Sequence, residues 1–162
     1  MRTKQNTVRP AWLVYAMAIL LPLAVGGLSA LLTMDGMRAY AQFNKPPLSP
    51  PGWVFPVAWT ALYALMGISS ALIYRSGNPA RTDALKLYGL QLILNFGWTI
   101  LFFGFDLFLA AFVWLLILEA VIIVMIAAFY AIRPRVAYLM IPYALWVAFA
   151  AYLNLGVFLL NR

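Results

Sequence analysis

Long apolar segments alternate with short polar connections along this chain. Five such segments cover residues 11–33, 53–74, 87–105, 107–132 and 136–160. Each has about the 20 residues that a helix needs to cross a bilayer core of roughly 30 Å. Because backbone groups in a bilayer must be satisfied internally, and the alternation typical of barrel strands is missing, we predict helices. The pattern indicates an all-α integral membrane protein, a compact bundle of five transmembrane helices in a single domain over residues 1–162.

The first apolar segment permits a second interpretation. Basic residues precede it and the small-residue stretch GGLSA lies near its end, as in a secretory signal peptide. Its apolar run is longer than the roughly 7–15 residues of a usual signal core. We therefore expect the segment to be kept as a helix, in which Gly26 and Ala30 form a small-residue patch for close helix packing.

The connections differ in length. Residues 104–106 and 133–135 are so few that the segments they join must form antiparallel hairpins, whereas the connection at 75–86 is polar and of ordinary length. The first connection, 34–52, is the only long one, and it ends in the stretch NKPPLSPPG. Its prolines hold the backbone out of helical geometry. We predict that these prolines limit the freedom of residues 44–51, so that this part of the connection is preordered.

Composition and charge support a membrane location. The chain is 66% hydrophobic and 9% charged, too little polar surface for a soluble domain of 162 residues. The net charge of +7 comes from residues at the ends of the apolar segments, which fits contact with membrane lipid and does not favour a nucleic-acid partner. Eight Lys and Arg lie on the side of the amino terminus and three on the other. The amino terminus is therefore predicted to be cytoplasmic in a plasma membrane.

The absence of cysteine and histidine narrows the chemistry. Neither disulfides nor the usual ligands of zinc, iron–sulfur clusters and haem iron are available, so we expect no metal site and no cofactor. Neither a nucleophile–base pair nor a phosphate-binding loop is found, which disfavours hydrolytic and phosphoryl-transfer enzymes. Glu119 is the only acid well inside a segment, and it is either a functional group or one side of a structural hydrogen bond between helices.

Three segments carry an aromatic or amide stripe at helical spacing. In the second, Phe55, Trp59 and Tyr63 recur every four residues, and the third carries Gln91, Asn95 and Trp98 at spacings of four and three. The fifth segment carries the remaining stripe, made by Tyr143, Trp146, Ala150 and Asn154. The stripes have two compatible interpretations. They are either packing surfaces, with Gln91 and Asn95 accepting from buried indole N–H groups, or walls of a concave site for a flat apolar ligand.

Three ordered stretches resemble the TspO/MBR family of tryptophan-rich sensory and translocator proteins. They are NKPPLSPPGWVFPVAWTALYALMG, QLILNFGWTILFFG and IPYALWVAFAAYLN. The resemblance implies a five-helix bundle, commonly a homodimer, whose first loop, here 34–52, folds as a lid over a pocket between helices. It also implies binding of porphyrins, notably protoporphyrin IX, and of other hydrophobic small molecules. Ala39 and Leu48 stand where many members carry aromatic residues, and sterol binding is not supported because Arg162 is too far from Tyr152.

The resemblance implies a set of ligand-binding residues and no catalytic residue in the ordinary sense. Trp59 and Trp146 are the tryptophans that the family pattern associates with porphyrin photochemistry. The implied ligand-binding set is Tyr40, Lys45, Pro51, Phe55, Trp59, Tyr63, Gln91, Asn95, Trp98, Tyr143, Trp146 and Phe149.

The leading hypothesis is a membrane receptor or carrier for tetrapyrroles. Either Arg38 or Lys45 would pair with porphyrin propionates, and the lack of His and Cys favours metal-free porphyrin over haem. One alternative is a light-dependent porphyrin-degrading activity in which Trp59 or Trp146 supplies the reactive indole. A second alternative is a structural or signalling membrane subunit whose partners are other proteins.

Overall fold

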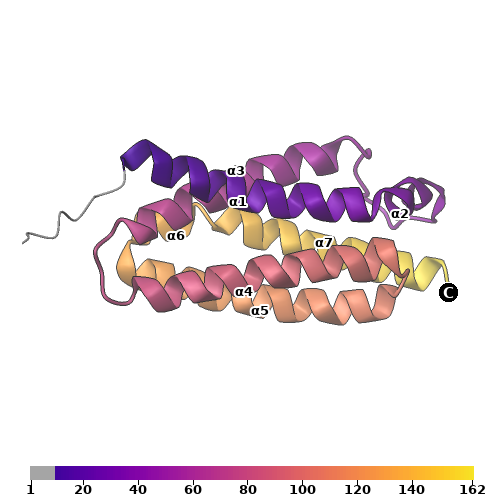
Figure 1. Ribbon diagram of the computed structural model, residues 1–162. Helices are drawn as coiled ribbons and strands as arrows, with labels where there is room; N and C mark the ends of the chain where they lie inside the picture. The colour runs from indigo at the N-terminus through magenta and orange to yellow at the C-terminus, as the bar shows by residue number, and fades with distance from the viewer. Residues whose placement is uncertain (1–9) are drawn as a thin grey trace, which may run out of the picture.

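The computed structural model describes residues 10–162 and is helical, without strands in that range (Figure 1). Five helical stretches are long and apolar enough to cross a membrane, which confirms the predicted all-α bundle. They are α1 (Ala11–Leu32), α3 (Val54–Tyr74), α4 (Arg81–Thr99) with its π-helical end η2 (Ile100–Gly104), α5 (Phe108–Ile132), and α6 (Pro134–Tyr138) followed by α7 (Ile141–Leu160). The basic residues Arg2, Lys4 and Arg9 lie outside the described residues.

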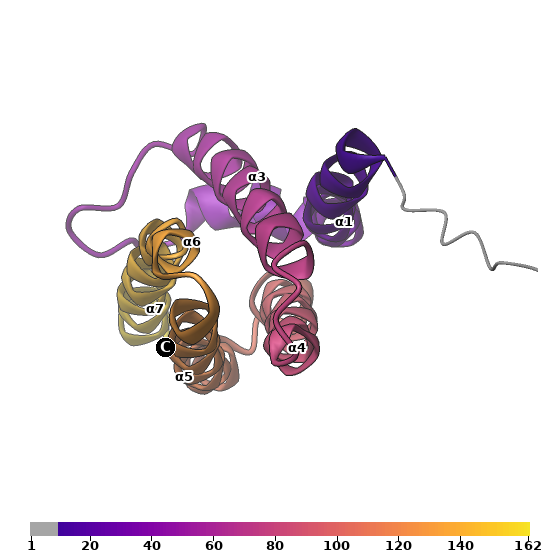
Figure 2. The ribbon, with the colours of Figure 1, turned by 90° about the vertical axis from the view of Figure 1, so that its left-hand side faces the viewer.

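The helices differ in how far they are covered by their neighbours. Viewed along the bundle, α3 and α4 are neighbours, α1 lies on their outer side, and α5 packs against α4 and α7 (Figure 2). Only 11% of the apolar stretch of α1 is buried, against 44% in α3. The first helix is therefore a peripheral element that packs mainly on α3, while the other four form the core.

Glycines allow the closest helix contacts. A Cβ at Gly67 of α3 would collide with the α1 backbone at Ile19, and a Cβ at Gly26 of α1 would collide with the ring of Tyr63. Gly97 of α4 gives the same room to the indole of Trp114 in α5, whose N–H donates to the Leu94 carbonyl at 2.7 Å. These contacts place α1 on α3 and join α4 to α5, as expected for small residues at membrane-helix interfaces.

Two helix boundaries differ from those predicted. The third helix begins at Arg81 and not at residue 87, because its first turn carries Asp83, which favours a helix N-terminus and pairs with Lys86 at 2.8 Å. The predicted connection 75–86 is therefore shorter and its charged end is helical. The fifth apolar segment is divided into α6 and α7, and Pro134 and Pro142 each stand in the first turn of one of them.

Loop 34–52 contains more helix than the sequence indicated. It starts with α2 (Met34–Ala39) and the 3₁₀ turn η1 (Tyr40–Gln42), and only the proline-rich part after Phe43 is non-helical, with a turn at residues 47–48. The proline-rich part docks on the end of α7. The Asn161 side chain accepts from the Asn44 N–H at 2.9 Å and donates to the Asn44 carbonyl at 2.8 Å, and Tyr152 donates to the Pro47 carbonyl at 2.8 Å.

Candidate ligand-binding site

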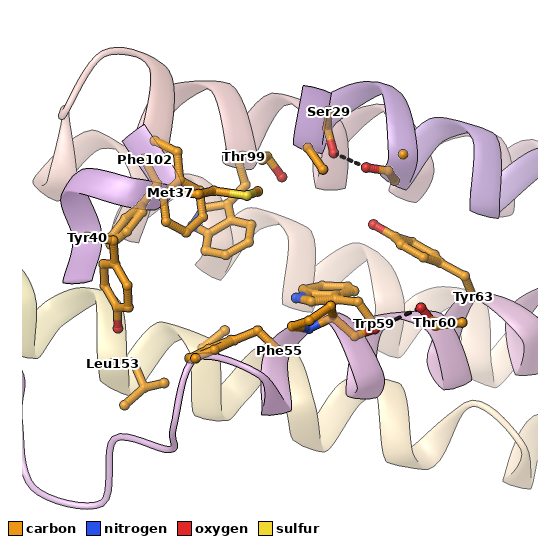
Figure 3. Close-up of a pocket in the computed structure, with 18 of the residues that line it drawn as sticks. Ser29, Met37, Tyr40, Phe55, Trp59, Thr60, Tyr63, Thr99, Phe102 and Leu153 are labelled. Atoms are coloured by element: carbon orange, nitrogen blue, oxygen red, sulfur yellow. Dashed lines mark hydrogen bonds between the residues drawn. The ribbon is translucent and has the colours of Figure 1, made fainter. Parts of the chain in front are cut away.

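A cavity of about 380 Å³ lies in the half of the bundle that faces loop 34–52 (Figure 3). Its walls come from α1, the α2–η1 segment, α3, α4 with η2, and α7. The lining residues are Gly26, Gly27, Ser29, Ala30, Met37, Tyr40, Gly52, Phe55, Pro56, Trp59, Thr60, Tyr63, Trp98, Thr99, Phe102, Phe103, Ala150, Leu153 and Asn154. Its volume is within the range of roughly 300–1,000 Å³ that is usual for small-molecule sites.

Trp59 is at the centre of the aromatic wall. Its indole stacks on Tyr63 with ring centroids 5.4 Å apart and lies 6.2 Å from the indole of Trp98. Both helices present these rings to one side because the residues recur at helical spacing, as predicted from the stripes. The wall offers broad apolar faces of the kind that stack on a flat ligand.

The π-helical turn η2 brings two consecutive rings to the cavity. Phe102 and Phe103 both line it, with centroids 4.7 Å apart, and the Phe105 N–H donates to the Ile100 carbonyl five residues before it. In a regular α-helix, neighbouring side chains diverge by about 100° around the axis. The turn thus extends the aromatic wall beyond Trp98, whose ring lies 5.8 Å from Phe102 and 6.0 Å from Phe103, and π-turns of this kind are frequent at functional sites.

The lid side of the cavity is formed by Tyr40. Its ring makes edge contacts with Phe55, Phe102 and Phe103 at centroid distances of 6.2, 5.9 and 5.7 Å. Burial raises the pKa of the Tyr40 phenol above its ordinary value, so the group is neutral. The Lys45 ammonium lies over the same ring, 4.9 Å from its centroid. A cation therefore stands just outside an aromatic cavity whose lining residues carry no charge.

A buried hydrogen-bonded chain lies behind the aromatic wall. Tyr63 donates to Asn95 Oδ1 at 2.9 Å, Asn95 donates to the Tyr143 hydroxyl at 3.3 Å, and Tyr143 donates to Gln91 Oε1 at 2.7 Å. Gln91, Asn95 and Tyr143 are thus placed together but in a second layer, and they do not line the cavity. The partner of the Trp98 indole is Asn154, at 3.1 Å, and not Gln91 or Asn95.

The other residues implied by the resemblance lie around the cavity. Tyr40, Phe55, Trp59, Tyr63 and Trp98 line it directly. Trp146 and Phe149 pack behind Phe55, with the Trp146 ring 6.1 Å from Phe55 and 5.8 Å from Phe149. Lys45 and Pro51 belong to the loop, where Pro51 precedes the lining residue Gly52. The indole N–H of Trp146 is buried and has no hydrogen-bond partner within residues 10–162.

Sequence reasoning missed the wall made by α1. Gly26, Ser29 and Ala30 line the cavity but carry none of the aromatic or amide side chains that defined the stripes. The small-residue patch was the available signal, and it was interpreted only as a packing surface. For Phe102 and Phe103, which were also missed, the available signal was the FF pair of the second motif.

The acidic residue singled out in the sequence does not lie at the cavity. Residues 10–162 contain no group of three or more His, Cys, Asp or Glu side chains placed to hold a metal ion. Glu119 is in α5, outside the cavity lining, and one of its carboxylate oxygens is buried without a partner in the described part of the chain. The arrangement is suited to holding a flat, largely apolar molecule.

Comparison with known sequences agrees with this architecture. A sequence profile described as the TspO/MBR family matches residues 18–160. The chain belongs to the TspO/MBR family. It is 37% identical to the tryptophan-rich protein TspO of Archaeoglobus fulgidus, over 89% of this chain and 94% of that protein. It is 37% identical to the translocator protein of Bos taurus, over 90% and 88% of the two chains, and 33% identical to the tryptophan-rich sensory protein of Cereibacter sphaeroides, over 75% and 76%.

Membership confirms the resemblance drawn from the three motifs. Together with the five apolar helices, it identifies an integral, multi-pass membrane protein. The match runs from within α1 to the last residue of α7, so the cavity lies entirely within the region that this chain shares with the family.

Proposed function

We propose that this protein is a membrane receptor or carrier that binds porphyrins, and other flat hydrophobic molecules, in the cavity beneath loop 34–52. The observation that carries the proposal is the uncharged aromatic cavity of about 380 Å³, with Trp59 stacked at its centre. An extended ring system gains stacking and burial on such walls. Transport or sensing of tetrapyrroles both require this binding step.

Charge at the rim supports a ligand with anionic substituents. Lys45 lies over Tyr40, a lining residue, and forms no ion pair within residues 10–162. Arg38, the other cation of the loop, is paired with Asp35 at 3.3 Å. Lys45 is therefore the better partner for a propionate whose porphyrin ring is inside the cavity.

Metal-free porphyrin is expected to bind better than haem. The chain has no His or Cys, and the one sulfur ligand in the lining is the thioether of Met37. Haem iron in proteins usually takes a His or Cys axial ligand. Haem would stack on the same aromatic rings as metal-free porphyrin, but its iron would gain no strong axial bond from the protein.

Titration of the purified protein in lipid nanodiscs tests the proposal. Protoporphyrin IX and haem are added separately while tryptophan fluorescence is followed. We expect saturable quenching by protoporphyrin IX, weakened in Trp59→Phe and unchanged in Trp12→Phe, a control whose indole is 70% exposed on α1. Equal affinity of the parent and a Trp59→Phe, Trp146→Phe double variant would overturn the assignment of the cavity. Absence of saturable binding together with a co-purifying protein would favour a structural or signalling subunit.

One observation favours light-dependent porphyrin breakdown as a second candidate. Trp59 lies within 5.4 Å of Tyr63 and 6.2 Å of Trp98, so a porphyrin stacked on it would touch a set of oxidisable rings. Illumination of the saturated complex in air should then bleach the porphyrin absorbance faster than in protein-free nanodiscs. Trp59→Phe should remove the difference if this indole is the reactive group.

Membrane topology and assembly belong to the same proposal. The amino terminus is assigned to the cytoplasmic side, which puts the cavity and loop 34–52 in the opposite half of the membrane. Since the chain has no cysteine, single Cys substitutions at Ser49 and Ser76 give clean reporters. An impermeant maleimide should label position 49 from outside intact cells and not position 76. The homodimer implied by the family stays a prediction, which native mass spectrometry of the nanodisc-released protein tests.

A further inference from the structure

Three of the hydroxyl groups that line the cavity donate their protons to backbone carbonyls. Ser29 donates to the Gly26 carbonyl at 2.9 Å, Thr60 to the Pro56 carbonyl at 2.7 Å, and Thr99 to the Asn95 carbonyl at 3.3 Å. Each hydroxyl has one proton and two lone pairs. Toward the cavity these groups therefore act as hydrogen-bond acceptors.

The Tyr63 hydroxyl also donates its proton, and unlike these three it is part of a longer chain of side-chain hydrogen bonds. It donates to Asn95 Oδ1, and the Asn95 amide nitrogen in turn donates to Tyr143, which donates to Gln91. Each residue of this chain donates its hydrogen bond to the next residue farther from the cavity. Hydrogen bonds arranged in series polarise one another, and an oxygen that donates becomes a stronger acceptor. The free lone pair of Tyr63 is thus the strongest neutral acceptor in the lining.

The two ends of the cavity differ in polarity. Ser29, Thr60 and Tyr63 lie together at the end between α1 and α3, while Tyr40 and Phe102 lie at the other end (Figure 3). Lys45 adds its charge at the Tyr40 end. One end therefore accepts hydrogen bonds and the other attracts anions.

We propose that the α1–α3 end of the cavity is an acceptor subsite, in which the Tyr63 oxygen receives a hydrogen bond from an N–H or O–H group of the ligand. The subsite selects flat apolar molecules that carry a donor on one edge and orients their anionic edge, where there is one, toward Lys45. A ligand with only carbonyl or ether oxygen at that edge would lose its water contacts and meet lone pairs, a mismatch that gives specificity. This inference rests on the proposed function and adds the ligand's chemistry and orientation.

Three pyrenes that differ at one position test the subsite. Binding of 1-hydroxypyrene, 1-methoxypyrene and pyrene is measured by energy transfer from tryptophan in nanodiscs, with partition into protein-free nanodiscs subtracted. We expect 1-hydroxypyrene to bind roughly threefold to tenfold more tightly than both others, the usual effect of one net hydrogen bond. Pyrene is the smallest of the three, so a steric effect of the methoxy group cannot produce this order. Equal affinities, or tighter binding of 1-methoxypyrene, would overturn the inference.

Variants assign the acceptor. Tyr63→Phe keeps the ring that stacks on Trp59 but removes the oxygen, so the preference for 1-hydroxypyrene should fall toward onefold while pyrene still binds. Tyr130→Phe is the control, because Tyr130 is 51% exposed on α5 and does not line the cavity. A preference retained in Tyr63→Phe would show that another oxygen is the acceptor and contradict the proposal. If Tyr63→Phe fails to fold, the order of the three pyrenes on the parent protein decides.

The porphyrin titration separates this inference from the proposed function. Protoporphyrin IX binding without discrimination among the pyrenes would contradict the subsite alone. Discrimination among the pyrenes without protoporphyrin IX binding would contradict the porphyrin assignment alone.

Discussion

Replacing Asn161 by alanine should release the proline-rich part of loop 34–52 from α7. The substitution removes the acceptor for the Asn44 N–H and the donor to the Asn44 carbonyl, two contacts of 2.9 and 2.8 Å between residues far apart in the chain. Each net hydrogen bond contributes about 0.5–1.5 kcal/mol, and the site is exposed, so we take the lower half of the range for both. Docking of the loop should weaken by about 1–2 kcal/mol, which raises local opening by roughly 5- to 30-fold.

Hydrogen exchange with mass spectrometry measures this opening at the Asn44 amide itself. Exchange over residues 43–49 should speed up by that factor in Asn161→Ala, and by a smaller one in Asn161→Asp, which keeps the acceptor and loses the donor. Tyr152→Phe loses only the bond to the Pro47 carbonyl, so it should speed exchange over residues 43–49 by less than Asn161→Ala does. Exchange within α5 should be the same in all four proteins. An unchanged rate over 43–49 in Asn161→Ala would refute the view that this side chain holds the loop.

Three further predictions concern packing, charge and pH. Gly67→Ala should lower the thermal midpoint strongly because its Cβ meets the α1 backbone, whereas Gly27→Ala, which has open space, should not; equal midpoints would contradict the close α1–α3 contact. Lys45→Gln should weaken protoporphyrin IX binding severalfold and reduce its salt dependence while leaving pyrene binding unchanged, as titrations at two salt concentrations would show. Because burial raises the pKa of Tyr40 above its ordinary value, the phenol stays protonated and porphyrin affinity should be constant from about pH 7 to 9.5. A fall in that window that Tyr40→Phe abolishes would disprove it.

The walls of the cavity were predictable to different degrees. Trp59 and Tyr63 were identified because aromatic residues four apart must share a helix face, and this periodicity survives in any tertiary structure. The α1 wall was not identified, because Gly26 and Ser29 contribute space and backbone proximity, which no periodic pattern of side chains records. Large side chains that project into a site can be predicted from their spacing, whereas small residues that leave room for the site cannot.

Hydrogen-bond partners were harder to predict than helix faces. Asn95 and Trp98 lie on one side of α4, yet Asn95 bonds to Tyr63 and Tyr143 while Trp98 bonds to Asn154 of α7. The outcome depends on the relative height and rotation of neighbouring helices, which spacing within one helix does not determine. The start of α4 at Arg81 was missed for a related reason, since a charged first turn beyond the apolar core carries no hydropathy signal.

The π-turn at Ile100–Gly104 makes the two halves of the aromatic wall separately adjustable. Trp98, before the turn, is held in register by α7, whereas the turn itself faces α2, where Gly36 lies against the Phe103 carbonyl. A π-turn contains one residue more than the α-helical path it replaces, so deleting a residue there would rotate everything that follows by about 100° and leave Trp98 in place. An insertion or deletion at this turn, more than a substitution, would therefore change the side of the cavity near the lid. The part of the wall that Trp98 forms would stay the same in such relatives of this protein.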